Sequence, residues 1–288
     1  MVEPGLAERT GVEHDGSGAR EVAVVADVWA QGDAYERFMG RWSRQVAPPF
    51  LEWLDAPAGL RWADVGCGSG ALTAAILEHC SPLSVLAVDP SAAQVDEAAR
   101  RIRHPRVSFG VATAERLPAR SFDVVVSGLV LNFVPDLGAT VRAMSYAAAG
   151  GTVAGYVWDY AGGMQLLRTF WDVACSLDPA AADLHEGHRF MLATAEELAD
   201  VWTQAGMGDV GSTAITVPTV FADFDDFWSP FLGGQGPAPA YVASLDVAAR
   251  QRLRAALEEA LVPELDGSIH LSARAWAVRG TPAAEPVS

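Results

Sequence analysis

The sequence contains no lysine, and all 20 of its basic residues are arginine. A lysine Schiff base needs a lysine amine, and the phosphate-binding loop of P-loop proteins needs a lysine next to the phosphates. Both kinds of chemistry are therefore excluded.

Cysteine is scarce, with three residues, Cys67, Cys80 and Cys175, and no CxxC pair. This argues against a disulfide framework and against a thiolate zinc site. The first residues lack the basic start and apolar core of a signal peptide, and no apolar run approaches the ~20 residues that span a bilayer. We therefore expect an unexported protein of the reducing cytoplasm that does not enter a membrane.

Positive charge is also in short supply, because 20 basic residues stand against 36 acidic ones, for a net charge of −16 and a pI of about 4.7. Such a surface repels phosphate backbones, so we expect no nucleic-acid partner. With 50% hydrophobic and 19% charged residues, the chain can bury a substantial core. Its length suits one large α/β domain with a cap.

Short β-like runs alternate with helical patterns, which predicts a parallel sheet with crossover helices. A strand near the end of the sheet is expected at 267–278, where apolar and polar residues alternate. The other β-like runs, each expected to form a strand, are 60–65, 83–88, 107–111, 122–126 and 152–157.

Two aromatic stretches with glycine and proline breaks, 158–192 and 221–241, interrupt the regular pattern. We expect them to form a cap over the edge of the sheet. The predicted organisation is a disordered tail (1–25), an N-terminal helical segment (26–58), a core of alternating strands and helices (59–157), the cap with the C-terminal strands (158–280) and a second disordered tail (281–288).

The most informative motif is RWADVGCGSGALTAAI at 61–76, in which a strand leads through Gly66, Gly68 and Gly70 into a helix. Glycines let the backbone turn tightly and approach a ligand, and the helix start presents free N–H groups. A nucleotide-like ligand suits this loop. Two alternatives remain, a purely structural turn and a dinucleotide fold, whose fingerprint Gly66, Gly68 and Ala71 also satisfy.

Two carboxylates indicate which ligand it is. Asp64 lies before the loop, where a dinucleotide would place its pyrophosphate, so a ligand with a positive group is favoured there. Asp89 ends the next predicted strand, at the spacing expected for a residue that binds a ribose hydroxyl pair. Alternatively, Asp89 only starts the helix that follows Pro90.

In these motifs the sequence resembles the class I S-adenosylmethionine-dependent methyltransferases of the small-molecule branch. The resemblance rests on DVGCGSG, AVDPS, VATAERLP, SFDVVVSGLVLNFVPD and GGTVAGYVW, in this order over about residues 30–160. The leader YERFMGRWS is similar to one subgroup of them. The resemblance implies a Rossmann-like three-layer α/β/α sandwich, with a mostly parallel seven-stranded sheet and one antiparallel strand near its end. It also implies methyl transfer from S-adenosylmethionine, with S-adenosylhomocysteine as product, to O, N or C of a small-molecule metabolite.

The resemblance also assigns cofactor contacts. Asp64 and the loop backbone would hold the methionine part, and Asp89 both ribose hydroxyls. Thr113 stands where the family commonly has an aspartate that accepts from the adenine amino group, and a threonine hydroxyl can also accept this bond. Asn132 stands where many relatives have histidine. The full expected set is Tyr35, Arg41, Asp64, Gly66, Cys67, Gly68, Gly70, Asp89, Pro90, Thr113, Ala114, Glu115, Ser127 and Asn132.

Tyr35 and Arg41 would come from a helix folding over the cofactor, where arginine pairs with the methionine carboxylate and an aromatic face attracts the sulfonium. Ordinary core packing is the alternative for such helix-spaced residues. For the acceptor, the aromatic cap predicts an apolar pocket of Trp158, Tyr160, Met164, Phe190 and Trp228.

No catalytic residue is assigned, because a base is needed only if the acceptor must lose a proton. Candidates for one are Asp159, Tyr160, His185 and His188. The two histidines have a spacing that metal ligands on a helix can have, but a third ligand is not evident, so we expect no metal. Other functions that the sequence leaves open are a non-catalytic or repurposed S-adenosylmethionine-binding protein and an NAD-dependent oxidoreductase.

Overall fold

The computed structural model describes residues 40–185, 192, 194–233 and 236–283. Its centre is a seven-stranded sheet in the order β3-β2-β1-β4-β5-β7-β6. The first five strands are parallel, and β7 runs antiparallel between β5 and β6. The strands are β1 (Arg61–Val65), β2 (Ser84–Asp89), β3 (Val107–Val111), β4 (Phe122–Gly128), β5 (Ala148–Trp158), β6 (Met207–Phe221) and β7 (Ile269–Pro282).

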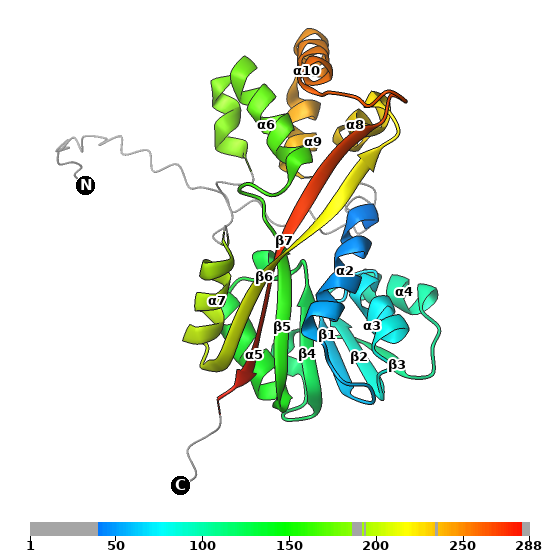
Figure 1. Ribbon diagram of the computed structural model, residues 1–288, viewed down its shortest axis with the longest axis vertical. Helices are drawn as coiled ribbons and strands as arrows, with labels where there is room; N and C mark the ends of the chain where they lie inside the picture. Colours follow the sequence, from blue (N-terminus) through cyan, green and yellow to red (C-terminus); the bar gives the residue numbers. More distant parts are fainter. Residues whose placement is uncertain (1–39, 186–191, 193, 234–235, 284–288) are drawn as a thin grey trace, which may run out of the picture.

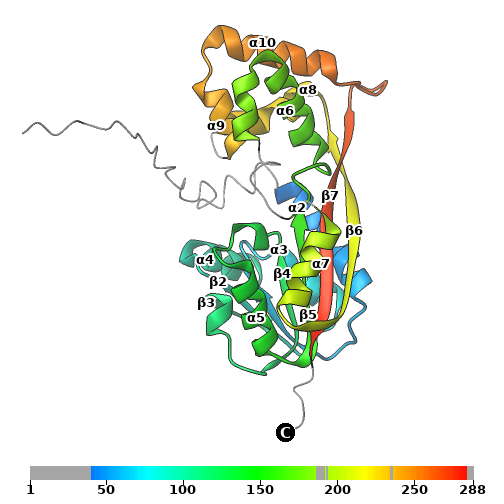
Figure 2. The same ribbon diagram turned by 90° about the vertical axis from the view of Figure 1, so that its left-hand side faces the viewer.

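Helices cover both faces of the sheet, with α2, α3 and α4 on one face and α5 and α7 on the other (Figures 1 and 2). This gives the three-layer α/β/α arrangement expected from the sequence. The bounds are α2 (Arg41–Leu54), α3 (Ala71–His79), α4 (Ala92–Arg101), α5 (Leu137–Ala147) and α7 (Ala195–Gln204).

The central strands are buried on both sides because helices lie on both faces. Trp62 and Val126 pack into the apolar layer under α2 and α3. Val125 and Val153 pack into the layer under α5 and α7, together with Trp202 of α7. The indole N–H of Trp202 donates to the Val153 carbonyl (3.1 Å), so this large side chain is buried without losing its hydrogen bond.

The cap lies beyond the carboxyl ends of the parallel strands, where β5 runs on into α6, and the long β6–β7 hairpin reaches up to it (Figures 1 and 2). A stacked Phe170–Phe231 pair, 4.4 Å between ring centroids, joins two of its elements. The cap comprises α6 (Gln165–Leu177), η4 (Pro179–Leu184), α8 (Phe224–Trp228), η6 (Ser229–Leu232), α9 (Pro237–Ser244) and α10 (Val247–Ala260).

An ion pair between a buried carboxylate and a partly exposed arginine lies at the junction between sheet and cap. Directly after β5, the Asp159 carboxylate accepts from Arg274 Nε of β7 (2.8 Å) and from the Gly162 N–H (2.9 Å). The Arg274 guanidinium lies over the Trp276 ring, 4.4 Å from its centroid. A Cβ at Gly163 would stand 2.6 Å from the Arg274 Cβ, so the turn fits closely around the pair.

The structure confirms the predicted fold class. Thr194 and Glu197 form a capping box at the start of α7. The sequence did not locate β6, and of the expected N-terminal helix the structure describes only α2. The first expected tail lies outside the described residues. The second was expected to begin at 281, but Thr281 and Pro282 still belong to β7, and 284–288 lie outside the described residues. The other domain boundaries stay predictions.

Among the described residues, no helix is long and apolar enough to cross a membrane. The expected cytoplasmic location and the expected lack of a nucleic-acid partner stay predictions.

Candidate functional site

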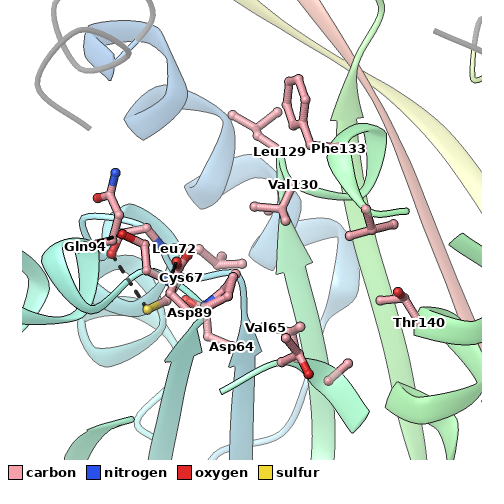
Figure 3. A pocket seen from close by; sticks show the side chains of 18 of the residues that line it. Asp64, Val65, Cys67, Leu72, Asp89, Gln94, Leu129, Val130, Phe133 and Thr140 are labelled. Carbon is pink, nitrogen blue, oxygen red and sulfur yellow. Dashed lines mark hydrogen bonds between the residues drawn. The ribbon is translucent and has the colours of Figure 1, made fainter. Parts of the chain in front are cut away.

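A cavity of about 680 Å³ opens at the carboxyl ends of β1, β2 and β4. It runs from the glycine loop and α4 to the segment after β4 (Figure 3). This is the edge of an open α/β sheet at which ligands usually bind. The lining residues are Ser43, Asp64, Val65, Gly66, Cys67, Gly68, Ser69, Ala71, Leu72, Asp89, Pro90, Ser91, Gln94, Ala112, Thr113, Ala114, Glu115, Gly128, Leu129, Val130, Phe133, Val134, Pro135, Thr140 and Tyr156.

The glycine loop lies against the cavity in a conformation that needs glycine. Gly66 and Gly68 have φ of +71° and +52°, in the left-handed region. A Cβ at Gly66 would stand 2.6 Å from Val130 Cγ1, whereas a Cβ at Gly68 would meet nothing within 4 Å in the described structure. Gly66 therefore serves packing, and Gly68 leaves the backbone open to a ligand.

Asp89 joins the glycine loop to the end of β2. One carboxylate oxygen, Oδ2, accepts from the Gly68 N–H (3.1 Å), and the other accepts from the Ser91 N–H (2.8 Å). Burial raises the pKa of this carboxyl group, and the two backbone hydrogen bonds oppose the rise. Each carboxylate oxygen can accept a further bond, so Asp89 can hold the loop and still receive two hydroxyl groups from the cavity.

Asp64 is fully buried at the base of the loop. Its Oδ2 accepts from the Thr73 hydroxyl of α3 (2.6 Å), and its Oδ1 has no hydrogen-bond partner within the described structure. Burial raises the pKa of Asp64 to about 7, the Thr73 bond lowers it, and the charge of Asp89 raises it. The site therefore places an incompletely satisfied carboxylate where a cationic group of a ligand would stabilise it.

The Cys67 thiol lies in the same loop. Its pKa is raised well above the usual range by burial and by the neighbouring carboxylates Asp64 and Asp89. The thiol is therefore neutral at physiological pH and acts as a small apolar group, not as a nucleophile.

Most of the residues expected to bind the cofactor line this one cavity. They are Asp64, Gly66, Cys67, Gly68, Asp89, Pro90, Thr113, Ala114 and Glu115. Tyr35 lies outside the described residues, and Arg41 is described only as the first residue of α2.

The structure places three of the expected cofactor residues beside the cavity instead of in its lining. Gly70 begins α3, and a Cβ there would stand 2.5 Å from Ile102 Cδ1. The buried Ser127 hydroxyl donates to the Val65 carbonyl (2.8 Å) and so ties β4 to β1. The Asn132 amide donates to the Trp158 carbonyl (3.5 Å).

The residues expected to form an acceptor pocket lie elsewhere. Trp158, Tyr160, Met164 and Trp228 are all buried in the large apolar cluster that joins the sheet to the cap, and none is part of the lining given above. Phe190 lies outside the described residues. The side chains of the four described residues are packed inside this cluster.

The candidate bases are also apart from the cavity lining. Asp159 is paired with Arg274, Tyr160 is buried, and the His185 ring stacks on Trp171 with centroids 5.7 Å apart. His188 lies outside the described residues. The described part of the chain contains no cluster of three potential metal ligands.

Sequence reasoning missed one wall of the cavity, which the segment after β4 supplies. Leu129, Val130, Phe133, Val134 and Pro135 line it. The signal was available in the motif SGLVLNFVPD, because a chain that leaves the carboxyl end of a central parallel strand lies at the ligand-binding edge.

Comparison with known proteins agrees with this geometry. Residues 63–151 match the family model of a methyltransferase domain. A ubiquinone biosynthesis O-methyltransferase of Nitrobacter winogradskyi is 27% identical over 192 residues, covering 61% of this chain and 66% of that protein. A trans-aconitate 2-methyltransferase of Methylobacterium radiotolerans is 34% identical over 93 residues, covering 32% of this chain and 35% of that protein. The chain thus spans less than two thirds of the length of these curated relatives.

Solved structures extend the likeness beyond the matched domain. The YcgJ protein of Bacillus subtilis superimposes with a TM-score of 0.54 at 16% identity, covering 85% of this chain and 100% of that one. A phosphoethanolamine N-methyltransferase of Haemonchus contortus was solved with phosphomonomethylethanolamine and S-adenosylhomocysteine. It superimposes with a TM-score of 0.53 at 17% identity, covering 87% of this chain and 57% of that one. The chain has the Rossmann-like fold of the class I methyltransferases, and its residues 63–151 match a methyltransferase domain.

Proposed function

We propose that the protein is an S-adenosylmethionine-dependent methyltransferase that acts on O, N or C of a small molecule. The observation that carries the proposal is the hydrogen-bonded pair of Asp89, at the end of β2, and Gly68, in the glycine loop after β1. A buried carboxylate faces the cavity there, beside a glycine whose Cβ position is open. The match of residues 63–151 to a methyltransferase domain supports it.

The residues of the cavity fit the cofactor in charge and shape. In the proposed complex Asp89 accepts from the two ribose hydroxyls, and Thr113 to Glu115 lie along the adenine. Asp64 stabilises the cationic methionine end, because its Oδ1 otherwise lacks a partner within the described structure. The donor supplies an activated methyl group whose C–S bonding electrons stay on sulfur when the methyl group leaves.

The chain contributes to the reaction chiefly by position and by exclusion of water. The apolar segment after β4 lines the cavity next to the glycine loop (Figure 3), with Val130 against Gly66, so it would hold an acceptor beside the donor. Aligning two reactants in a dry site removes much of the entropic cost of their encounter. No described residue is assigned as a base in this scheme, because Asp159, Tyr160 and His185 lie apart from the lining.

Isothermal titration of the full chain with S-adenosylmethionine, S-adenosylhomocysteine and NADH tests the proposal. We expect both sulfur compounds to bind and NADH not to bind. In Asp89→Ala, loss of a charged acceptor should weaken binding by ~1.5–3 kcal/mol. Asp96→Ala on the exposed face of α4 is the matched control and should bind as the wild type does. Binding of NADH alone, or unchanged affinity in Asp89→Ala, would refute the assignment.

A further inference from the structure

The cavity has two sides of different chemistry. The side at the ends of β1 to β3 carries the carboxylates Asp64, Asp89 and Glu115. The segment after β4 forms the other side with Leu129, Val130, Phe133, Val134 and Pro135, all of them apolar, and the two sides meet where Val130 packs against Gly66. We refer to these five residues as the apolar wall.

The apolar wall begins with a strained residue. Leu129 has φ of +61°, a left-handed conformation that is unfavourable for a bulky side chain. Its N–H donates to the Tyr156 carbonyl of β5 (2.8 Å), which holds the residue in place. Figure 3 shows the Leu129 side chain beside that of Phe133 at the end of β4. Strain of this kind is concentrated at ligand sites, which indicates that the wall is shaped for an occupant.

Charge at the cavity has one sign. The charged side chains among the described lining residues are all carboxylates, namely Asp64, Asp89 and Glu115. The start of α5, next to Pro135, does not offer an anion site either, because the Asp136 carboxylate already accepts from the Ala139 N–H (2.8 Å). A carboxylate or phosphate on the acceptor would lose its hydration there without a cation among the described lining residues to replace it.

We infer that the methyl acceptor is an uncharged, apolar molecule whose body packs on the apolar wall, and that acceptors carrying a carboxylate or phosphate are rejected. The inference rests on the proposed function, since it assigns the carboxylate side of the cavity to the methyl donor. It deepens that function by naming the substrate class.

The test uses two probes of equal size and different charge, 1-naphthol and 1-naphthoate. Each is titrated into the full chain saturated with S-adenosylhomocysteine, and binding is followed by saturation-transfer NMR and calorimetry. We expect naphthol to bind at least about tenfold more tightly than naphthoate, because burying an unpaired charge is costly.

Phe133→Arg places a cation on the wall at a half-buried position. We expect it to reduce or reverse the preference for naphthol. Val220→Arg is the matched control, because Val220 is exposed on β6 and 45% accessible, and it should keep the wild-type preference. Phe133→Ala is a second variant that removes the ring from the wall. It should weaken naphthol binding with little change in S-adenosylhomocysteine affinity.

The outcomes separate the two claims. If S-adenosylhomocysteine does not bind, the proposed function fails, and this inference fails with it. If it binds and naphthoate binds as well as naphthol, or neither probe binds, the acceptor class is wrong while the cofactor assignment stands. Naphthol binding that is unaffected by both Phe133 variants would place the probe elsewhere and overturn the inference.

Discussion

Asp64 should make the stability of the ligand-free protein fall as pH rises. Burial raises its pKa to about 7 from 3.8. An acid with a raised pKa in the folded state contributes stability that is present below the unfolded pKa and is lost as pH rises through the folded pKa. The shift of about 3 pKa units, at about 1.36 kcal/mol each, corresponds to a loss of roughly 4 kcal/mol across this interval.

The assay is urea denaturation of the wild type and of Asp64→Asn at several pH values between 5 and 8. Asparagine is uncharged at every pH and its oxygen can still accept from Thr73, so the variant should be the more stable protein at pH 8. The difference in unfolding free energy should grow by about 3 kcal/mol from pH 5 to pH 8. Comparing the two proteins cancels the titration of groups that do not interact with Asp64.

Asp123 provides a control of opposite sign, since its hydrogen bonds from Arg61 lower its pKa to about 2. The stability that Asp123 contributes is present above pH 3.8 and is lost only as pH falls through about 2. The difference in unfolding free energy between wild type and Asp123→Asn should therefore not change between pH 5 and 8. A pH-independent difference between wild type and Asp64→Asn would refute the reasoning about burial of Asp64.

Three further changes test other parts of the structure. Gly66→Ala should lower the melting temperature more than Gly68→Ala, because both place alanine at positive φ but only the Gly66 Cβ would collide with Val130. Gly68→Ala should also weaken S-adenosylhomocysteine binding in calorimetry, and an equal loss of melting temperature in the two variants would contradict the different roles. Arg274→Met should lower the free energy of unfolding in denaturant by about 2 kcal/mol. This is less than the loss expected for a fully buried ion pair, because Arg274 is partly solvated. Adding Asp159→Asn should restore part of the lost stability. Trp202→Ala should cost about 3–5 kcal/mol, and a loss below about 1 kcal/mol would show that the layer under α7 repacks.

The sequence predicted the parallel core well, because its strands are continuous apolar runs bounded by glycine, proline and charged residues. It failed to locate β6, whose residues at 207–221 include glycines, threonines and Pro218. At the edge of a sheet such residues are tolerated, and the apolar alternation that marks a half-buried strand is weaker there.

The candidate site also has parts that the sequence could predict and parts that only the fold reveals. The glycine loop and Asp89 each follow a predicted parallel strand, so their proximity could be predicted from the sequence, and the structure places both in the lining of one cavity. Asp159 could not, because its partner Arg274 is 115 positions away and only the fold shows that the carboxylate is neutralised. The cap aromatics were equally ambiguous, since sequence does not decide whether a ring lines a cavity or packs on another ring, as Phe170 does on Phe231.

The position of β7 has a consequence for biosynthesis. This strand, Ile269–Pro282, is inserted between β5 and β6, and both pair with it. During translation, β1 to β5 can assemble early, but the free side of β5 has no strand to pair with until Ile269–Pro282 has left the ribosome. An unpaired strand edge is a template for aggregation. Ribosome stalling or premature termination before Ile269 should therefore yield an aggregation-prone product that depends on chaperones, although the whole glycine loop has already been made.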